Sequence, residues 1–146
     1  MAATRRLMRE FAEFNEHKPF GAVAETESDN LYKWKIVFQG PPATPYEGGI
    51  FNISVEYPPK YPHEEPNLRM VTKIYHPNVD PKDGRSCAGI EWNPAMKTWK
   101  IFEAIYNIIK TPNPESAVDT ECASLMVSNK QEYTRKAREF TQLYAK

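Results

Sequence analysis

The stretch LYKWKIVF, from Leu31 to Phe38, decides the fold class of this chain. Every second side chain in it is aromatic or aliphatic, namely Tyr32, Trp34, Ile36 and Phe38. The two lysines, Lys33 and Lys35, fall between them. Because successive side chains of a β-strand point to opposite faces, this alternation predicts a strand with one buried face.

Two segments downstream repeat the alternation. The first carries apolar residues at every second position, Phe51, Ile53, Val55 and Tyr57. The second is short, and Leu68 and Met70 are its apolar members. A weaker strand is expected over residues 21–26, before the turn at residues 28–30. Short loops between such strands imply an antiparallel meander of about four strands.

Helices are expected on both sides of these strands. From Thr4 to about Glu16, apolar residues recur at steps of three and four while charged residues fall elsewhere, which is typical of an amphipathic helix. Its apolar members are Leu7, Met8, Phe11 and Phe14, and its charged members are Arg5, Arg6, Arg9, Glu10 and Glu13. A strongly apolar pattern from Trp99 to Ile109 predicts a central helix that ends before residues 111–114.

Two further helices are predicted at the C-terminal end. Pro114 suits the first turn of one of them, and its apolar face would consist of Val118, Cys122 and Leu125. Ser128 and Gln131 have capping-box spacing at the start of the last one. The apolar residues that share one face of that last helix are Tyr133, Ala137, Phe140 and Tyr144.

Composition and charge narrow the class of function. Lys plus Arg and Asp plus Glu both total 19, so the formal net charge is zero. Bulk electrostatics therefore give no argument for nucleic acid or a membrane as a partner. The N-terminal residues lack the apolar run of a signal peptide, and we expect a cytoplasmic or nuclear protein. In a reducing compartment Cys87 and Cys122 are expected as free thiols.

Residues 74–87, IYHPNVDPKDGRSC, interrupt the strand and helix patterns. Pro77, Pro81 and the pair Asp83-Gly84 exclude a continuous helix or a central strand, so we expect an ordered surface loop that presents Cys87 to solvent. A thiolate is a strong nucleophile and can carry an acyl group as a thioester. A lone cysteine is more often a packing residue, so the loop context carries this assignment.

Two other side chains of this loop are candidates for a role at the site. Asn78 is a neutral donor, suited either to hold the loop or to stabilise a developing oxyanion. His76, directly before Pro77, is expected to brace its own loop and not to act as a base for the cysteine. The three histidines and two cysteines show no paired ligand spacing, so no metal site is expected.

Taken together, His76-Pro77-Asn78, Cys87 and Trp92-Asn93-Pro94-Ala95 resemble the ubiquitin-conjugating enzymes. The resemblance extends along nearly the whole chain. Residues 40–51 and 57–66 are similar to the strand-region signature of the family, and residues 111–115 and 133–140 to its C-terminal landmarks. In three details the chain departs from the commonest family pattern: a longer interval before the cysteine, a shorter interval after it, and Ala88-Gly89 in place of leucine.

The resemblance supports an α+β fold over a single domain, residues 1–146. Its parts are an N-terminal helix, a four-stranded antiparallel meander sheet, an active-site loop, a central helix and two C-terminal helices. It implies that Cys87 accepts ubiquitin from the activating enzyme as a thioester and that a substrate lysine then attacks it, usually with a ubiquitin ligase. Asn78 would be the oxyanion donor, and His76, Pro77 and Ser116 would support the active site. No metal or organic cofactor is required, and a monomer is expected.

The resemblance also marks surfaces for partners. Residues assigned to binding of the ligase or the activating enzyme are Arg5, Arg6, Arg9, Pro62, His63, Pro94 and Ala95. Many family members that work with HECT-type ligases carry Phe at the position of His63, so a RING-type ligase is the expected partner. The alternatives are a solvated charged face for the arginines and an ordinary surface histidine for His63.

Two other functions stay open. The modifier could be a ubiquitin-like protein, because the activating enzyme selects it through surfaces that the sequence reveals only in part. The chain could also be a non-catalytic module that scaffolds ubiquitin. Such variants generally lack the cysteine and often the last helices, and this chain has both.

Overall fold

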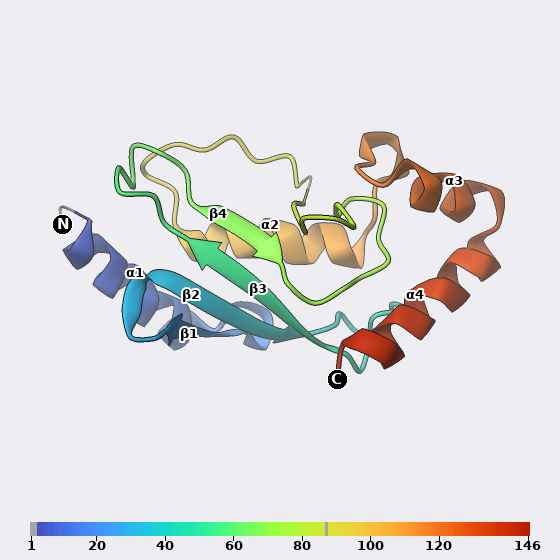
Figure 1. The fold of residues 1–146 in the computed structure, drawn as a ribbon, viewed down its shortest axis with the longest axis horizontal. Helices are drawn as coiled ribbons and strands as arrows, with labels where there is room; N and C mark the ends of the chain where they lie inside the picture. The colour runs from blue at the N-terminus through green and yellow to red at the C-terminus, as the bar shows by residue number, and fades with distance from the viewer. Residues whose placement is uncertain (1–2, 87) are drawn as a thin grey trace.

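A computed structural model describes residues 3–86 and 88–146. The elements that the structure describes are α1 (Thr4–His17), the 3-10 turn η1 (Pro19–Gly21), β1 (Val23–Glu27), β2 (Asn30–Gln39), β3 (Ile50–Glu56), β4 (Asn67–Met70), α2 (Thr98–Lys110), the 3-10 turn η2 (Pro114–Ser116), α3 (Thr120–Ser128) and α4 (Lys130–Tyr144). Within these residues the four strands form one antiparallel sheet in sequence order (Figure 1). The predicted α+β fold with a meander sheet is confirmed.

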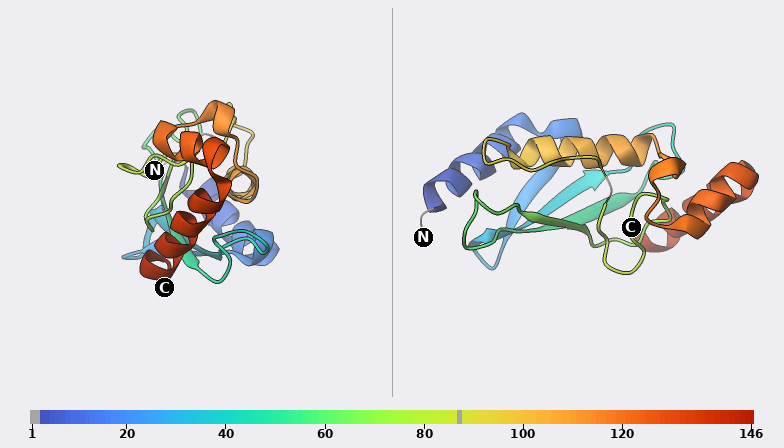
Figure 2. Two further views of the ribbon diagram at one scale, coloured as in Figure 1. Left: turned by 90° about the vertical axis from the view of Figure 1, so that its right-hand side faces the viewer. Right: turned by 90° about the horizontal axis from the view of Figure 1, so that it is seen from above.

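The core lies between the sheet and α2, which runs beside it (Figures 1 and 2). Alternate residues of β2 point into this core, and Trp34, Ile36 and Phe38 are all buried. Phe102 of α2 packs edge-on against Phe38, with ring centroids 5.3 Å apart. Edge-on contact suits aromatic rings because the positive edge of one meets the negative face of the other. The alternation in the sequence therefore identifies the buried face of β2 correctly.

The helix α1 corrects two assignments made from the sequence. Leu7 and Phe14 are buried as predicted, but Met8 is 59% exposed and Glu10, expected on the charged face, is 1% exposed. The reason is the helical period. Residue 10 lies one turn after Leu7 on the same face, whereas residue 8 is turned by about 100° from Leu7.

The start of α3 also differs from the prediction. Pro114 lies in the short turn η2, and the helix begins only at Thr120. Asp119 caps it, because its side chain accepts a hydrogen bond from the Cys122 amide at 3.1 Å. Val118 therefore precedes the helix and is 39% exposed, whereas the predicted burial of Cys122 is confirmed.

The cap of α4 is shifted by one residue from the predicted position. Ser128 is the last residue of α3, and the side chain of Asn129 accepts the hydrogen bond from the Glu132 amide at 3.2 Å. Asn129 and Glu132 have the same three-residue spacing as the predicted pair Ser128 and Gln131, so the motif is right and its register is wrong. Together α3 and α4 extend the molecule beyond the end of the sheet (Figure 1). None of the helices in the described part of the chain is both long and apolar enough to span a bilayer.

Candidate active site

The segment between β4 and α2 carries the candidate site. Cys87, the predicted nucleophile, lies outside the described residues, so the site is built from the residues around it. The chain reaches Ser86 through a hairpin: Val79 and Ser86 pair in an isolated antiparallel bridge, and the Asp80 amide donates to the Arg85 carbonyl at 2.7 Å. The hairpin consists of residues 79–86 and leads directly into Cys87.

Gly84 fastens this hairpin to the end of the sheet. Its carbonyl accepts a hydrogen bond from the Met70 amide at 2.9 Å, and its φ is +79°. A Cβ at this position would lie 2.1 Å from the Met70 carbonyl oxygen, far inside van der Waals contact. The close approach of the two backbones therefore requires glycine here.

His76 connects the same loop to α2. Its side chain is fully buried. Nδ1 accepts a hydrogen bond from the Asn78 amide at 2.9 Å, which leaves Nε2 as the protonated nitrogen that donates to the Ile108 carbonyl at 2.9 Å. Burial lowers the pKa of His76 to about 4. The imidazole is therefore neutral near pH 7, and both of its nitrogens are occupied by backbone groups.

Asn78 connects the loop to the segment after α2. It is fully buried, and its Oδ1 accepts from the Asn113 amide at 2.8 Å. Its Nδ2 donates to the carbonyls of Asn113 and Ser116 at 2.9 and 3.1 Å. The carbonyl of the buried residue Pro77 adds two bonds, from the amides of Val118 and Asp119. Both hydrogens of the Asn78 amide group are thus already bonded to backbone oxygens.

Ser116 is brought to the loop by these bonds, although its own side chain is exposed. The sequence thus selects His76, Pro77, Asn78 and Ser116, and the structure brings all four together. Sequence reasoning missed Asn113, which supplies two of the three groups that bind the Asn78 side chain. The sequence does contain a signal for Asn113, because the prolines on both sides of it, Pro112 and Pro114, restrict the backbone there.

A groove of about 400 Å³ is lined by residues on both sides of Cys87 in the sequence. Ser86 and Ala88, the neighbours of Cys87 in sequence, both line it. Its apolar wall includes Leu68, Trp92 and Ile101. A partly apolar groove of this kind is typical of a surface that binds a ligand or a partner segment.

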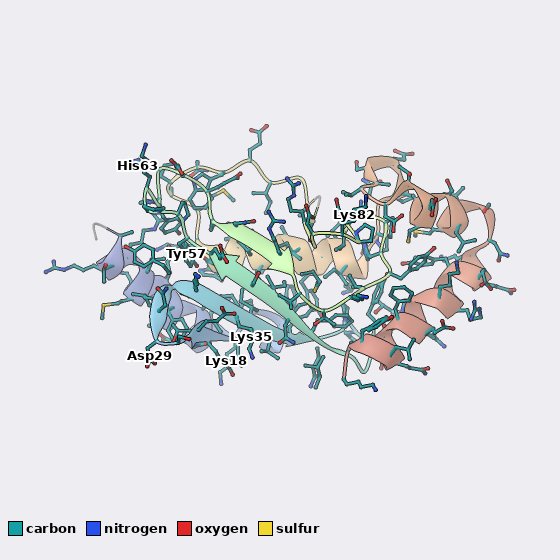
Figure 3. All side chains as sticks on the ribbon, in the orientation of Figure 1. Lys18, Asp29, Lys35, Tyr57, His63 and Lys82 are labelled. Atoms are coloured by element: carbon teal, nitrogen blue, oxygen red, sulfur yellow. The ribbon has the colours of Figure 1, made fainter. Side chains whose placement is uncertain are left out.

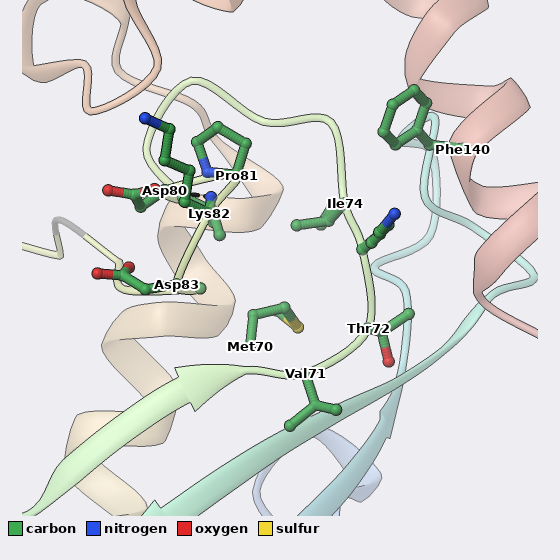
Figure 4. A pocket seen from close by; sticks show the side chains of 12 residues that line it. Met70, Val71, Thr72, Ile74, Asp80, Pro81, Lys82, Asp83 and Phe140 are labelled. Carbon is green, nitrogen blue, oxygen red and sulfur yellow. Dashed lines mark hydrogen bonds between the residues drawn. The ribbon is translucent and has the colours of Figure 1, made fainter.

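A second pocket, of about 330 Å³, lies between residues 70–74 and the hairpin, with Phe140 of α4 at one side (Figure 4). Asp80, Lys82 and Asp83 belong to its lining. Two carboxylates beside a lysine do not make a metal site. Residues 3–86 and 88–146 contain no group of three or more His, Cys, Asp or Glu side chains that could hold a metal ion.

Cys122 has the environment of a structural cysteine. It belongs to α3 and is fully buried, and burial raises the pKa of its thiol to about 12. Because the thiolate is the reactive form, this residue is a poor nucleophile near pH 7.

The residues predicted to bind partners gather at the other end of the molecule. Arg5 and Arg9 of α1 are exposed, as are His63, Pro94 and Ala95, whereas Arg6 and Pro62 are partly buried. Figure 3 shows His63 at the end where α1 begins. Contacts join these segments: the Trp92 indole donates to the Pro62 carbonyl at 3.0 Å, and Arg6 donates to the carbonyls of Pro94 and Met96.

Comparison with known proteins agrees with this arrangement. The family model described as ubiquitin-conjugating enzyme matches residues 6–141. The chain is 36% identical over 148 residues to ubiquitin conjugating enzyme E2 B of Dictyostelium discoideum, with all of both chains covered. It is 37% identical to ubiquitin-conjugating enzyme E2 13 of Schizosaccharomyces pombe, with 99% of each covered. A solved E2 domain of a Toxoplasma gondii ubiquitin conjugating enzyme superposes with a TM-score of 0.90 at 32% identity, over 97% of this chain and 99% of that one.

Proposed function

The chain belongs to the ubiquitin-conjugating enzyme family, transferases that work through a thioester intermediate, and on this premise we propose that Cys87 is the residue that carries ubiquitin. One contrast between the two cysteines supports the proposal. Cys87 follows directly on a hairpin that the buried residues His76 and Asn78 help to fix, whereas Cys122 is buried and its pKa is raised to about 12.

The reaction consists of two acyl transfers. In the first, the Cys87 thiolate attacks the thioester carbonyl of ubiquitin on the activating enzyme, and the thiolate of that enzyme leaves. In the second, a neutral lysine amine attacks the carbonyl of the new thioester and the Cys87 thiolate leaves. The amine gives up one proton to solvent, and an isopeptide bond remains. Since a thiolate is a good leaving group, the protein has mainly to orient the lysine, lower its pKa by desolvation and stabilise the oxyanion.

Asn78 has two candidate roles in this scheme, and its hydrogen bonds favour one of them. To donate to an oxyanion, its Nδ2 would have to release the carbonyl of Asn113 or Ser116. Giving up either hydrogen bond costs about 1 kcal/mol and loosens the connection to residues 113–116. We therefore infer that Asn78 contributes chiefly by holding residues 113–116 against the active-site loop.

Two further observations concern the ligase and the modifier. His63 is exposed and stands where many HECT-compatible members carry Phe, which supports a RING-type ligase. The relatives that match over the full chain are named as ubiquitin-conjugating enzymes, which supports ubiquitin over a ubiquitin-like modifier.

Loading of the purified protein tests the proposal. The chain is incubated with ATP, ubiquitin-activating enzyme and ubiquitin, and adducts are separated with and without a reducing thiol. We expect a thiol-sensitive adduct that Cys87→Ser converts to a thiol-resistant ester, because an alkoxide is a poorer leaving group than a thiolate.

Cys122→Ser is the matched control and should keep the thiol-sensitive adduct. If Cys122→Ser, and not Cys87→Ser, abolished the adduct, the assignment of Cys87 as the nucleophile would be wrong. Parallel reactions with ubiquitin-like modifiers and their own activating enzymes test the choice of modifier. An adduct with none of the pairs would favour the scaffold alternative.

A further inference from the structure

Glu10 is a buried carboxylate that the proposed chemistry does not use. It lies on α1, yet its Oε1 accepts hydrogen bonds from the Thr98 amide at 2.8 Å and the Thr98 hydroxyl at 3.0 Å. Thr98 is the first residue of α2, where amides have no partner within the helix. Lys97, the preceding residue, supplies no side-chain cap in the described structure. Glu10 therefore caps α2 from a different helix, where a negative charge is also favoured by the helix dipole.

The other oxygen of Glu10 faces the surface assigned to partners. Its Oε2 accepts from Arg6 Nε at 2.9 Å and from the Tyr61 hydroxyl. Tyr61 directly precedes Pro62, and its ring also lies under the Arg6 guanidinium, 5.1 Å from the ring centroid. One carboxylate thus joins α1, the start of α2 and the loop that carries Pro62 and His63.

Arg6 extends this network to a third segment. Its Nη1 donates to the Pro94 carbonyl, and its Nη2 donates to the Met96 carbonyl at 2.6 Å. Its side chain is only 25% exposed, so the guanidinium is directed at its own chain. Arg5 and Arg9, on the same helix, are exposed, and the structure of residues 3–86 and 88–146 gives them no ion pair or side-chain hydrogen bond.

We propose that Glu10 and Arg6 are positioning residues that fix the ligase surface by holding residues 61–63 and 94–96 at a set distance from α1. Arg6 thus acts through these loops and does not bind the ligase itself, in contrast to the direct contact that the sequence suggests. The inference rests on the proposed function for the identity of the partner. The positioning itself can be measured on the free protein.

The choice of variant follows from the chemistry of the buried pair. Removing the Glu10 side chain would leave the Arg6 charge without its partner and the α2 amide without its cap, so the fold could be lost. Glu10→Gln is milder, because the amide oxygen can still accept from Thr98. Its NH2 group would then face the donors of Arg6 and Tyr61, so only the connection to the surface is broken. Tyr61→Phe removes a single hydroxyl from the same network.

The first measurement uses the free protein, with nitrogen-15 labelling and NMR. The Trp92 indole donates to the Pro62 carbonyl, so its signal reports on the loop that carries Pro62. The Trp34 indole, which donates to the Leu31 carbonyl at 2.7 Å within β2, gives a second indole signal for comparison. We expect Glu10→Gln and Tyr61→Phe to shift the Trp92 indole signal and the amide signals of residues 63, 64 and 95–97, since Pro62 and Pro94 have no backbone N–H. Ile36→Val, a small change in the buried face of β2, is the control and should leave those signals in place. Unchanged surface signals in Glu10→Gln would overturn the proposal.

The second measurement uses a RING domain that accelerates discharge of the loaded wild-type protein. We expect Arg6→Ala and Glu10→Gln to weaken its binding to a similar extent, about tenfold, as for loss of a charge-assisted hydrogen bond. Because Glu10 is buried, it can act on the ligase only through the loops. The double variant Arg6→Ala/Glu10→Gln should bind with about the affinity of the single variant that binds less tightly, because both changes break the same connection. The loss of affinity in Arg9→Ala should instead add to that in Glu10→Gln.

The outcomes separate the two possible roles of Arg6. If Arg6→Ala loses affinity while Glu10→Gln binds as the wild type does, Arg6 is a direct contact and the proposal is wrong. Wild-type affinity in both variants would also overturn it. Loading by the activating enzyme is followed separately. A wild-type chain that fails to load refutes the proposed function, whereas the spectra of the free protein still decide whether Glu10 positions the loops.

Discussion

Acidification from about pH 7 to about pH 4 should weaken the fold through His76. The ring is fully buried and neutral, with Nδ1 accepting from the Asn78 amide and Nε2 donating to the Ile108 carbonyl. Protonation of Nδ1 would place one donor against another. Burial disfavours the charged ring further, so the pKa of His76 falls from 6.5 to about 4 in the folded protein.

The size and sign of the effect follow from these two pKa values. Above pH 6.5 the ring is neutral in both states, and the folded protein has its full stability. As the pH falls toward 4, the unfolded chain binds a proton that the native ring excludes, so the free energy of unfolding decreases. The free energy of unfolding falls by about 1.4 kcal/mol for each pH unit, so the decrease reaches about 3 kcal/mol near pH 4. Below pH 4 it stays at about that value, because the native ring then binds a proton as well.

Urea unfolding at a series of pH values, followed by tryptophan fluorescence, measures this loss. His76→Asn is the reference variant because Asn cannot titrate and its Oδ1 can still accept from the Asn78 amide. The variant should be less stable at neutral pH by about 1 to 3 kcal/mol, because the Ile108 carbonyl loses its donor.

The carboxylates titrate in the wild type and in His76→Asn alike, so their contribution cancels in the difference between the two free energies of unfolding. We expect the stability advantage of the wild type to shrink by about 3 kcal/mol between pH 6.5 and 4. A difference that stays constant with pH would refute the argument that His76 is buried in its neutral form.

Three further predictions concern the loop and the partner surface. Asn78→Ala should lower the melting temperature and slow discharge to free lysine only modestly; a well-folded variant that loads normally but discharges about a hundredfold more slowly would establish an oxyanion role instead. Gly84→Ala should lower the free energy of unfolding in urea by more than about 2 kcal/mol, because its Cβ would meet the Met70 carbonyl. The control is Gly89→Ala, at a φ of +71° with open space around it, and it should lower the free energy of unfolding by only about 1 to 2 kcal/mol. His63→Phe should increase transfer to HECT domains if this position sets the ligase class, and transfer at the wild-type level would count against that assignment.

Local pattern was sufficient for most of the fold. Alternation in residues 31–38 and 51–57 identified the central strands, and the helical period of residues 99–109 identified α2. It was also sufficient for the burial of Cys122. These features depend on neighbours within a few positions, because the period of a strand or helix is itself a local property of the backbone.

For the candidate site, the sequence by itself determined which loop to examine and which residues in it matter. Prolines and glycines mark that loop because they restrict or extend the backbone angles at their own positions. The sequence also showed that His76 and Asn78 lie close together, but it left open whether Asn78 is free to donate to a reacting atom.

Only the tertiary structure decided what Asn78 and Glu10 do. Asn78 binds the carbonyls of Asn113 and Ser116, 35 and 38 positions away, and Glu10 caps a helix 88 positions away. No local pattern encodes such partners, because they exist only after separate elements have packed together. A buried polar group must find a hydrogen-bond partner wherever the fold provides one, and for these two side chains the packing of α2 and of the segment after it determines that partner.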